Sequence, residues 1–407
     1  MAIKGEIPDR EPKTMEEWAE FVKQDFIGRE EPLATFGDHA SLIQTAEGVT
    51  ARDFRDYSLA IGNDNPLYTD SCYAANTRWA GIIAPPTFNM ILRAAGTAGV
   101  VYKKGIKVTS LNGGIECYNY DVIRPGDRLR NEKIESDIEM KTGGRGGVMP
   151  IVYARQHCWN QRDQLIVKMV GWSLHPQLHM DGGARISTPR GIYKYSDQER
   201  ERIINDIVNY PPRRGCRPLY WEDVNVGDKL PTKCTGPCTY GDFRANCDGV
   251  RLAQYGKSFE ISYYLYKGRN SGKSSNPATN WDWADEHSDP IVCVNRGIPL
   301  PFDHGVARSA YAATIVTDWM GDDGWLFRLK TAHRETYLIG DTLWLTGTVV
   351  GKEMIKEGAS VRLELSMSNQ LGRVATQGEA TVLLPTRVHG SVKLPIPISL
   401  IPHETLS

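Results

Sequence analysis

Several side chains that can move protons occur near one glycine in the second half of the sequence. His304 and Gly305 lie in FDHGVARSAYAATIV, where a turn leads into an apolar segment typical of a buried helix. A helix N-terminus offers unpaired backbone N–H groups and a positive dipole, which together stabilise negative charge on an oxygen atom. Asp242 and Asp248, in TYGDFRANCDGV, are the nearest carboxylates on the preceding predicted helix. A base close to such N–H groups suits general acid–base catalysis.

Each of these residues also has a structural interpretation, and the sequence leaves both open. His304 can shape the turn that precedes the helix. Asp242 can cap or charge the first turn of its helix, and Asp248 can mark where that helix ends. The sequence therefore supplies candidates for a proton-transfer site without assigning the base.

Composition bounds the class of protein. The chain has 407 residues, enough for two domains, with 41% hydrophobic and 24% charged residues, as in globular proteins. The net charge of −1 gives no basic excess for nucleic-acid binding. No apolar run reaches the length of a membrane span, and the first residues lack the apolar core of a signal peptide, so we expect a cytoplasmic protein. Cys234, Cys238 and Cys247 fit no standard zinc spacing, and we expect no metal site.

The sequence contains one set of landmarks twice. The pair Asn65-Pro66 recurs 211 residues later at Asn276-Pro277. A junction between a turn and a helix occurs at 84–95 and again at 303–316, and a Gly-Asp turn occurs in RPGDRL and in LIGDTL. Three landmarks in the same order and at nearly the same offset indicate a duplicated fold.

Each half is predicted to have helices first and strands afterwards. ARDFRDYSLAIG has a helical pattern, and a central apolar helix follows it in each half. Segments rich in Val, Ile, Thr and aromatic residues come next and indicate strands. These segments are KIESDIEMKTG, VMPIVYARQHCWN and QLIVKMVGWSLH, then DTLWLTGTVVGKEM, ASVRLELSMSN and RVATQGEATVLLP. We predict an α+β fold of two hot-dog units, each a central helix wrapped by an antiparallel sheet, which together form one continuous sheet.

The predicted units are residues 1–185 and 218–407. The linker between them, 186–217, holds a short charged helix and ends near a Pro-Pro pair. Residues 250–280 have no counterpart in the first half and are polar, rich in Tyr and then in Gly, Ser and Asn. An insertion of this length indicates either a functional cover or a mobile loop.

At GNDNPLYTD, GIIAPPTF and FDHGVARSAYAATIVTDWMGDDGWL the chain resembles the MaoC-like (R)-specific enoyl-CoA hydratases and dehydratases in their fused double hot-dog form. The resemblance extends over nearly the whole chain beyond residue 15. It implies a lyase that hydrates an enoyl-CoA or dehydrates a 3-hydroxyacyl-CoA in a degradation pathway. It implies no cofactor, since coenzyme A is part of the substrate, and it is compatible with a homodimer or a partner subunit.

The family motif, Gly-Asp-x-Asn-Pro-hydrophobic-His-x-Asp, is altered in the first half. In the family, the Asp and the His activate the water that adds to the enoyl thioester. Here Asn63 replaces the Asp and Tyr68 replaces the His, while Asn65 is retained. Asn cannot act as a base, and a tyrosine is a poor one because its pKa is near 10. We therefore expect Asn63, Asn65 and Tyr68 to shape the substrate pocket or the local turn.

The second half departs from the motif as well. SSNPATNWDWA resembles its later part, but Thr279 or Asn280 stands at the His position, so that Asn280 and Asp282 are either substrate contacts or helix caps. His287 lies a little downstream. The start of the central helix matches, and in the family the N–H after this turn holds the thioester oxygen, a role that falls on Gly305.

The sequence thus predicts a hydro-lyase for a CoA thioester with a bulky or unusual acyl group, and with a non-standard acid and base. The alternatives are a catalytically degenerate scaffold that binds acyl-CoA or pairs with an active subunit, and an acyl-CoA thioesterase. The fold does not decide among these three functions.

Overall fold

The structure is a computed structural model of the chain. It describes residues 9–28, 48–91, 102, 104–106, 108–142, 148–177, 190–249, 287, 290, 293 and 298–397. Asn280, Asp282 and the insertion at 250–280 lie outside the described residues, as does the part of the first predicted central helix that follows residue 91.

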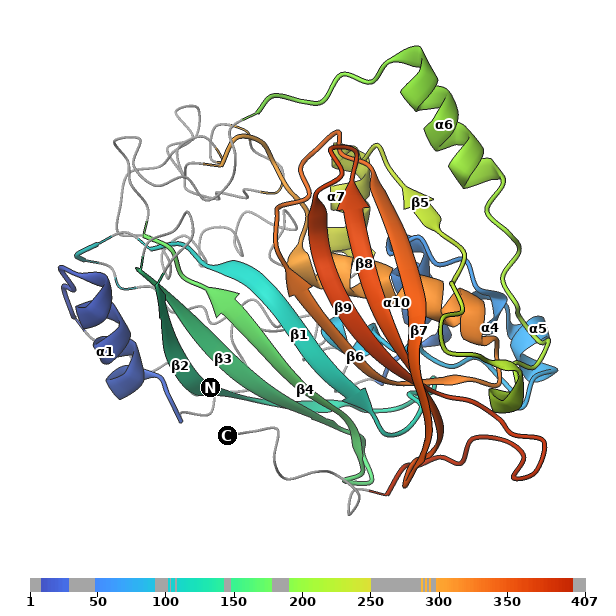
Figure 1. Cartoon of the computed structure of the whole chain (residues 1–407). Helices are drawn as coiled ribbons and strands as arrows, with labels where there is room; N and C mark the ends of the chain where they lie inside the picture. Colours follow the sequence, from blue (N-terminus) through green and yellow to red (C-terminus); the bar gives the residue numbers. More distant parts are fainter. Residues whose placement is uncertain are drawn as a thin grey trace.

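Apart from the short strand β5, helices precede the strands in each half, as predicted (Figure 1). The first half contains α1 (Met15–Asp25), α3 (Ala51–Ala60), α4 (Pro66–Thr69), α5 (Ser71–Ala75), the 3-10 helix η2 (Phe88–Ile91), β1 (Leu111–Asn119), β2 (Arg130–Thr142), β3 (Val148–Trp159) and β4 (Leu165–Leu174). The remainder contains α6 (Asp197–Val208), the 3-10 helix η4 (Trp221–Asp223), β5 (Lys233–Thr235), α7 (Tyr240–Gly249), α10 (Gly305–Met320), β6 (Trp325–His333), β7 (Leu343–Ile355), β8 (Gly358–Asn369) and β9 (Val374–Leu383).

All nine strands form one sheet in the order β2-β3-β4-β1-β6-β9-β8-β7-β5. The order of β2-β3-β4-β1 is the mirror image of β6-β9-β8-β7, and every described pairing is antiparallel. Strand β6 begins 214 residues after β1, and β9 begins 209 residues after β4. The predicted duplication, the single continuous sheet and the double hot-dog fold are therefore confirmed.

Strands β1 and β6 join the two halves. Their register runs from Gly114 opposite Ala332 to Tyr118 opposite Arg328. At one end of this seam the Asn119 Nδ2 donates to the carbonyl of Leu326 at 2.9 Å, and the Trp325 Nε1 donates to the carbonyl of Asn119 at 2.8 Å. These buried polar groups are satisfied across the seam, which fixes the position of one half against the other.

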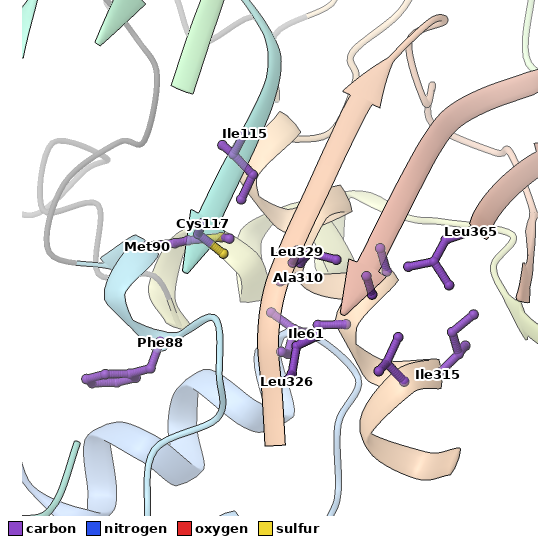
Figure 2. Packing of buried hydrophobic residues seen from close by; sticks show 14 of the residues in the cluster. Ile61, Phe88, Met90, Ile115, Cys117, Ala310, Ile315, Leu326, Leu329 and Leu365 are labelled. Carbon is purple, nitrogen blue, oxygen red and sulfur yellow. The ribbon is translucent and has the colours of Figure 1, made fainter. Parts of the chain in front are cut away.

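The helix α10 is the centre of the second hot-dog unit. Every residue in it except Tyr311 is buried, which its many alanines permit because they let the helix approach the strands closely. It packs against β1 as well as β6, β7, β8 and β9. Figure 2 shows Ala310 and Ile315 of this helix in one hydrophobic cluster with Ile115 and Cys117 of β1. One core therefore spans both halves.

The charged helix predicted in the linker is α6, which begins with a capping box between Ser196 and Glu199. The linker segment before it is attached to the second half, because the Tyr195 hydroxyl donates to the carbonyl of Gly340 at 2.9 Å. The unit boundaries at 185 and 218 stay predictions. In the described part of the chain, no helix is both long and apolar enough to cross a membrane.

Loss of packing at the seam should destabilise the whole protein. Ile115 is fully buried, so Ile115→Ala should lower the free energy of unfolding by about 2–5 kcal/mol. Val350 is 43% exposed on β7, so Val350→Ala is the control and should change this free energy by less than about 0.5 kcal/mol. Urea unfolding measures both. Equal effects of the two variants would contradict a shared core at β1.

Candidate active site

The N-terminus of α10 is set between the two halves of the sheet. Gly305 is the first helical residue, and His304 precedes it in an extended conformation. Within the described residues, the His304 side chain makes no capping hydrogen bond to the helix. The first backbone N–H groups of α10 are therefore not taken by the usual side-chain cap, which is the condition for holding an oxygen of a ligand there.

Two histidine rings stack at this helix start. The ring centroids of His287 and His304 lie 3.6 Å apart with the planes 33° from parallel. The Nδ1 atom of His287 lies 2.7 Å from the carbonyl oxygen of Phe302. A carbonyl can only accept, so Nδ1 carries the proton, and Nε2 of a neutral His287 then has a basic lone pair. Burial lowers the pKa of His304 well below its usual value, and the nearby His287 lowers it further.

Gly305 makes room for a side chain of the first half. A Cβ atom placed on Gly305 would lie 2.7 Å from Cβ and 2.9 Å from Oδ1 of Asn112. In the structure it is Asn112, on β1, that occupies the space where a side chain of residue 305 would lie.

A buried ion pair flanks the first turn of α10. Nε of Arg308 lies 2.8 Å from Oδ2 of Asp303, with side-chain exposures of 4% and 1%. Arg308 also donates to the carbonyl of Glu335. Burial raises the pKa of the Asp303 carboxyl to about 7, while the charge of Arg308 acts in the opposite direction and Asp341 adds to the rise. Asp303 is thus a buried carboxyl group that can titrate near neutral pH.

His333, at the end of β6, faces the same turn of α10. Its Nδ1 lies 3.0 Å from the Thr376 hydroxyl, and the ring also forms a hydrogen bond with the backbone of Gly305. Burial and the charge of Arg308 lower the pKa of His333 well below its usual value, against a smaller opposing effect of the Gly305 backbone. The ring is therefore neutral around pH 7.

The altered motif of the first half has a structural role in the described region. The Oδ1 of Asn63 accepts from the backbone N–H of Asn65 at 3.1 Å, and the Oδ1 of Asn65 accepts from that of Leu67 at 3.0 Å. Asn65 is the N-cap of α4, and Pro66 is its first residue. The motif is retained as a turn and a cap.

Tyr68, at the former His position, is 2% exposed. Burial raises the pKa of its hydroxyl far above its usual value, and the carboxylates of Asp322 and Asp318 raise it further. Next to it Arg213 of the linker forms ion pairs with Asp64 and, at 3.6 Å, with Asp318. Tyr68 therefore stays protonated and is surrounded by charges that already have partners.

The two ends of α10 thus differ. Asp318 follows Gly305 by thirteen residues, which corresponds to about 20 Å along a helix. The altered first-half motif is near the Asp318 end, whereas His287, His304 and Asn112 are at the Gly305 end. Only the Gly305 end combines a helix N-terminus with imidazole groups in the described residues.

The remaining predicted residues are not brought to this end by any described contact. Asp242 is exposed, and its Oδ2 accepts from the Thr239 backbone N–H at 2.6 Å and from the Thr239 hydroxyl at 2.7 Å. This is the helix cap that the structural interpretation expects. Asp248 lies on α7, but its side chain is not described, and a catalytic role for either aspartate stays a prediction.

The sequence reasoning did not single out four residues at this site: Asn112, Asp303, Arg308 and His333. Asp303 lies in FDHGVARSAYAATIV, the segment in which the start of a buried helix was predicted. Asn112 had a local signal, because Gly113-Gly114 inside a strand indicates a bulge or a close approach of another backbone. His333 had none, since it is positioned by Thr376 on a distant strand. Arg308 lies five residues after Asp303, but this spacing alone does not indicate a buried ion pair.

Comparison with known proteins shows which proteins the first half of the chain resembles. A family model described as FAS1-like, dehydratase domain region, matches residues 38–169. The UPF0336 protein of Streptomyces avermitilis is 30% identical over 111 residues, which are 26% of this chain and 67% of that protein. The UPF0336 protein of Saccharopolyspora erythraea is 29% identical over 125 residues, 30% of this chain and 74% of that protein.

Solved structures extend the similarity to both halves. A MaoC-like dehydratase superposes with a TM-score of 0.57 at 16% identity, covering 83% of this chain and 94% of that one. A protein described as a MaoC domain dehydratase from Chloroflexus aurantiacus gives a TM-score of 0.51 at 13% identity, covering 83% and 92%. At these identities the likeness shows the fold.

The contact between Gly305 and Asn112 can be tested by a double-mutant cycle. Gly305→Ala should lower the free energy of unfolding by about 1–3 kcal/mol, because its new Cβ would overlap Asn112. Asn112→Gly removes the overlapping atoms, so the double variant should recover part of this loss. Additive effects of the two substitutions in thermal or urea unfolding would contradict the contact.

The raised pKa of Asp303 predicts a pH dependence of stability. The unfolded chain releases this proton near pH 4, whereas the folded chain holds it until about pH 7. Its contribution to stability is therefore present below pH 4 and is lost as the pH rises through 7, by up to about 1.4 kcal/mol per pH unit.

The variant Asp303→Asn should remove this part of the slope. The variant should also be less stable at every pH, because Arg308 loses its buried partner. The comparison therefore uses the pH dependence of the free energy of unfolding and not its absolute value. The measurement is the free energy of urea unfolding at several pH values between 4 and 8. Identical slopes in the two proteins would show that Asp303 does not titrate in this range.

Proposed function

Because the chain belongs to the UPF0336 protein family and has the double hot-dog fold of the MaoC-like dehydratases, we propose that it is a hydro-lyase acting on an acyl thioester of coenzyme A. The proposed reaction is the reversible addition of water to an enoyl-CoA to give a 3-hydroxyacyl-CoA. The observation that carries the proposal is the α10 N-terminus, where the histidine pair lies against the start of a buried helix.

Hydration of a conjugated thioester needs three groups. A base takes a proton from water while the water oxygen bonds to the β-carbon. An acid then delivers a proton to the α-carbon, and donors hold the thioester oxygen, which carries negative charge in the enolate-like intermediate. The sum is one water molecule added across the double bond, with no oxidant, reductant or cofactor besides the coenzyme A of the substrate.

We assign the proton transfer to His287. Its Nδ1–H is fixed on the carbonyl of Phe302, which leaves Nε2 as the basic atom. His287 is half-buried, whereas Asp242 is exposed and engaged with Thr239. A protonated His287 can return the proton to the α-carbon, so one imidazole serves as base and then as acid. His304 supports this ring by stacking.

The thioester oxygen is assigned to the N-terminus of α10. The backbone N–H of Gly305 and the helix dipole stabilise negative charge there. The neutral state of the buried His304 avoids a permanent positive charge next to the oxygen in the resting protein. Such donors act where water is excluded, so their effect on the transition state is large.

The proposal also covers the acyl group of the substrate and the oligomeric state of the protein. We propose a bulky or unusual acyl group because the polar insertion at 250–280 replaces the region where the family has its motif. Pairing with a second copy or a partner subunit is proposed on the family resemblance alone.

A panel of acyl-CoA thioesters separates hydro-lyase from scaffold and thioesterase. Loss of the conjugated enoyl-thioester absorbance without release of free thiol supports the hydro-lyase. Release of thiol supports a thioesterase. Tight binding of acyl-CoA without either reaction supports a scaffold.

His287→Gln tests the assignment of the base. Glutamine keeps polarity but carries no titratable proton, so kcat should fall about 10²–10⁴-fold with little change in KM. His389→Gln, at an exposed histidine in the loop after β9, is the matched control and should keep the wild-type kcat. A wild-type kcat in the His287 variant would move the base to another residue, with Asp248 the first to test.

A further inference from the structure

Beyond the proposed reaction, we propose that a cleft between the linker and the C-terminal end of α10, lined by Arg214, Arg217, Lys229 and Trp319, binds a phosphate group. The phosphate would be either free or the ester of a small organic molecule. The two arginines of the linker would hold its oxygens. The inference does not depend on the proposed hydro-lyase, because the cleft lies at the end of α10 opposite to Gly305.

The cleft lies where the linker passes the last turn of α10 (Figure 1). The backbone N–H of Arg214 donates to the carbonyl of Asp318 at 2.9 Å, and the Arg214 Nε donates to the carbonyl of Trp319 at 2.8 Å. These bonds attach the linker to the end of the helix. The cleft has a volume of about 450 Å³, within the range of about 300–1,000 Å³ that is usual for pockets that bind small organic ligands.

The residues that line the cleft include both cations and carboxylates. The cations are Arg213, Arg214, Arg217 and Lys229, and the carboxylates are Asp223, Asp228 and Asp318. Each carboxylate already has a partner: Arg387 at 2.7 Å from Asp223, the backbone N–H of Asn225 at 2.8 Å from Asp228, and Lys233 at 2.9 Å from Asp318. Arg213 is paired as well, with Asp64 and Asp318. Among the described residues, the cations of the cleft without a carboxylate partner are therefore Arg214, Arg217 and Lys229.

The positive charges of Arg214 and Arg217 act on each other in this cleft. Each side chain uses its Nε on a backbone carbonyl, Arg214 on that of Trp319 and Arg217, at 3.4 Å, on that of Arg214. Burial lowers the pKa of Arg214 and the charge of Arg217 lowers it further, whereas the charge of Asp223 acts in the opposite direction. Like charges that interact in a half-buried cleft are unfavourable, and a bound anion would relieve this repulsion.

A phosphate group suits the charges and the size of the cleft. Guanidinium groups bind phosphate oxygens through parallel N–H donors, and two of them can neutralise the charge of a phosphate monoester. Lys229 supplies a third cation, and its Nζ donates to the Thr348 hydroxyl at 3.0 Å, which leaves two further N–H groups. The wall also contains Pro211, Pro212 and Pro231, whose apolar rings suit the organic part of an ester.

The competing interpretation is that these arginines only complete the end of α10. Arg214 donates to a terminal carbonyl, and the helix dipole stabilises a cation there. The side chain of Arg217 donates to the linker instead of the helix, so this interpretation predicts no effect of Arg217→Gln on phosphate. In our proposal, Arg217→Gln relieves the repulsion on Arg214 in the free protein and also weakens binding, and these two effects on stability have opposite signs.

The experiment titrates the full chain with inorganic phosphate, adenosine 5′-monophosphate and adenosine, in chloride buffer of about 0.15 M ionic strength. Isothermal titration calorimetry gives Kd, and thermal unfolding gives the rise in Tm that follows from binding to the folded state. The variants are Arg214→Gln and Arg217→Gln. Arg128→Gln is the matched control, because it removes the same charge from an exposed arginine in the turn before β2, outside the cleft.

We expect saturable binding of phosphate and of the monophosphate, and none of adenosine. A lower Kd for the monophosphate identifies an ester as the ligand, and equal Kd values identify the free ion. Arg217→Gln should raise both Kd values about tenfold or more, because charge-assisted hydrogen bonds are lost, while its Tm without ligand equals or exceeds that of the wild type. Arg214→Gln should weaken binding as far and lower the Tm, because the end of α10 loses a donor. Arg128→Gln should keep the wild-type Kd.

Four results would overturn the inference. They are no saturable binding of either phosphate compound up to about 10 mM, binding of adenosine as tight as that of the monophosphate, a wild-type Kd in Arg217→Gln, and equal weakening in Arg217→Gln and Arg128→Gln. The last would show a general attraction of charge without a site. If Arg214→Gln does not fold, the comparison of the other two variants decides. None of these results bears on the hydration of enoyl-CoA, which the thioester panel measures separately.

Discussion

The pairing of β1 with β6 is the interaction on which the rest of the structure depends. It converts two four-stranded repeats into one sheet, to which the short β5 adds an edge strand. A single core then runs beneath the seam, and α10 packs on strands of both halves. The start of this helix consequently lies beside a strand from the other half. Without the seam, Gly305 would have no neighbour at Asn112, and the candidate site would lose one of its walls.

The candidate site contains more polar groups than core packing requires. Asp303 and Arg308 are almost fully buried as an ion pair, and His333 is kept neutral beside them. Replacing a buried ion pair by apolar residues often leaves stability unchanged or improves it, so this pair is weak evidence for a stabilising role. Its place at the first turn of α10 suits a different role, which is to set the electrostatic potential around an oxygen held by the helix N-terminus.

Much of the fold could be predicted from local sequence patterns, whereas most residues of the candidate site could not. Six strands were visible because Val, Ile and aromatic residues alternate in them, and α3, α6 and α10 had helical periodicity. Strands β1 and β6 were not predicted. The first contains Asn112-Gly113-Gly114, which weakens a strand pattern, and the second has charged residues on its outer face, Arg328 and Lys330, that find Glu116 only across the seam. Likewise, Gly305 was found from its helix start, whereas Asn112 and His333 reach it through pairings between distant segments.

Arg213 in the linker affects whether the Asp and the His of the family motif could be restored at positions 63 and 68 of the first half. It joins Asp64 in the altered motif to Asp318 at the end of α10, and Tyr68 is buried against the same carboxylates. An aspartate at position 63 and a histidine at position 68 would therefore lie among charged groups that already have ion-pair partners. Restoring the two motif residues would therefore also require changes among the charged groups around Arg213, Asp64 and Asp318.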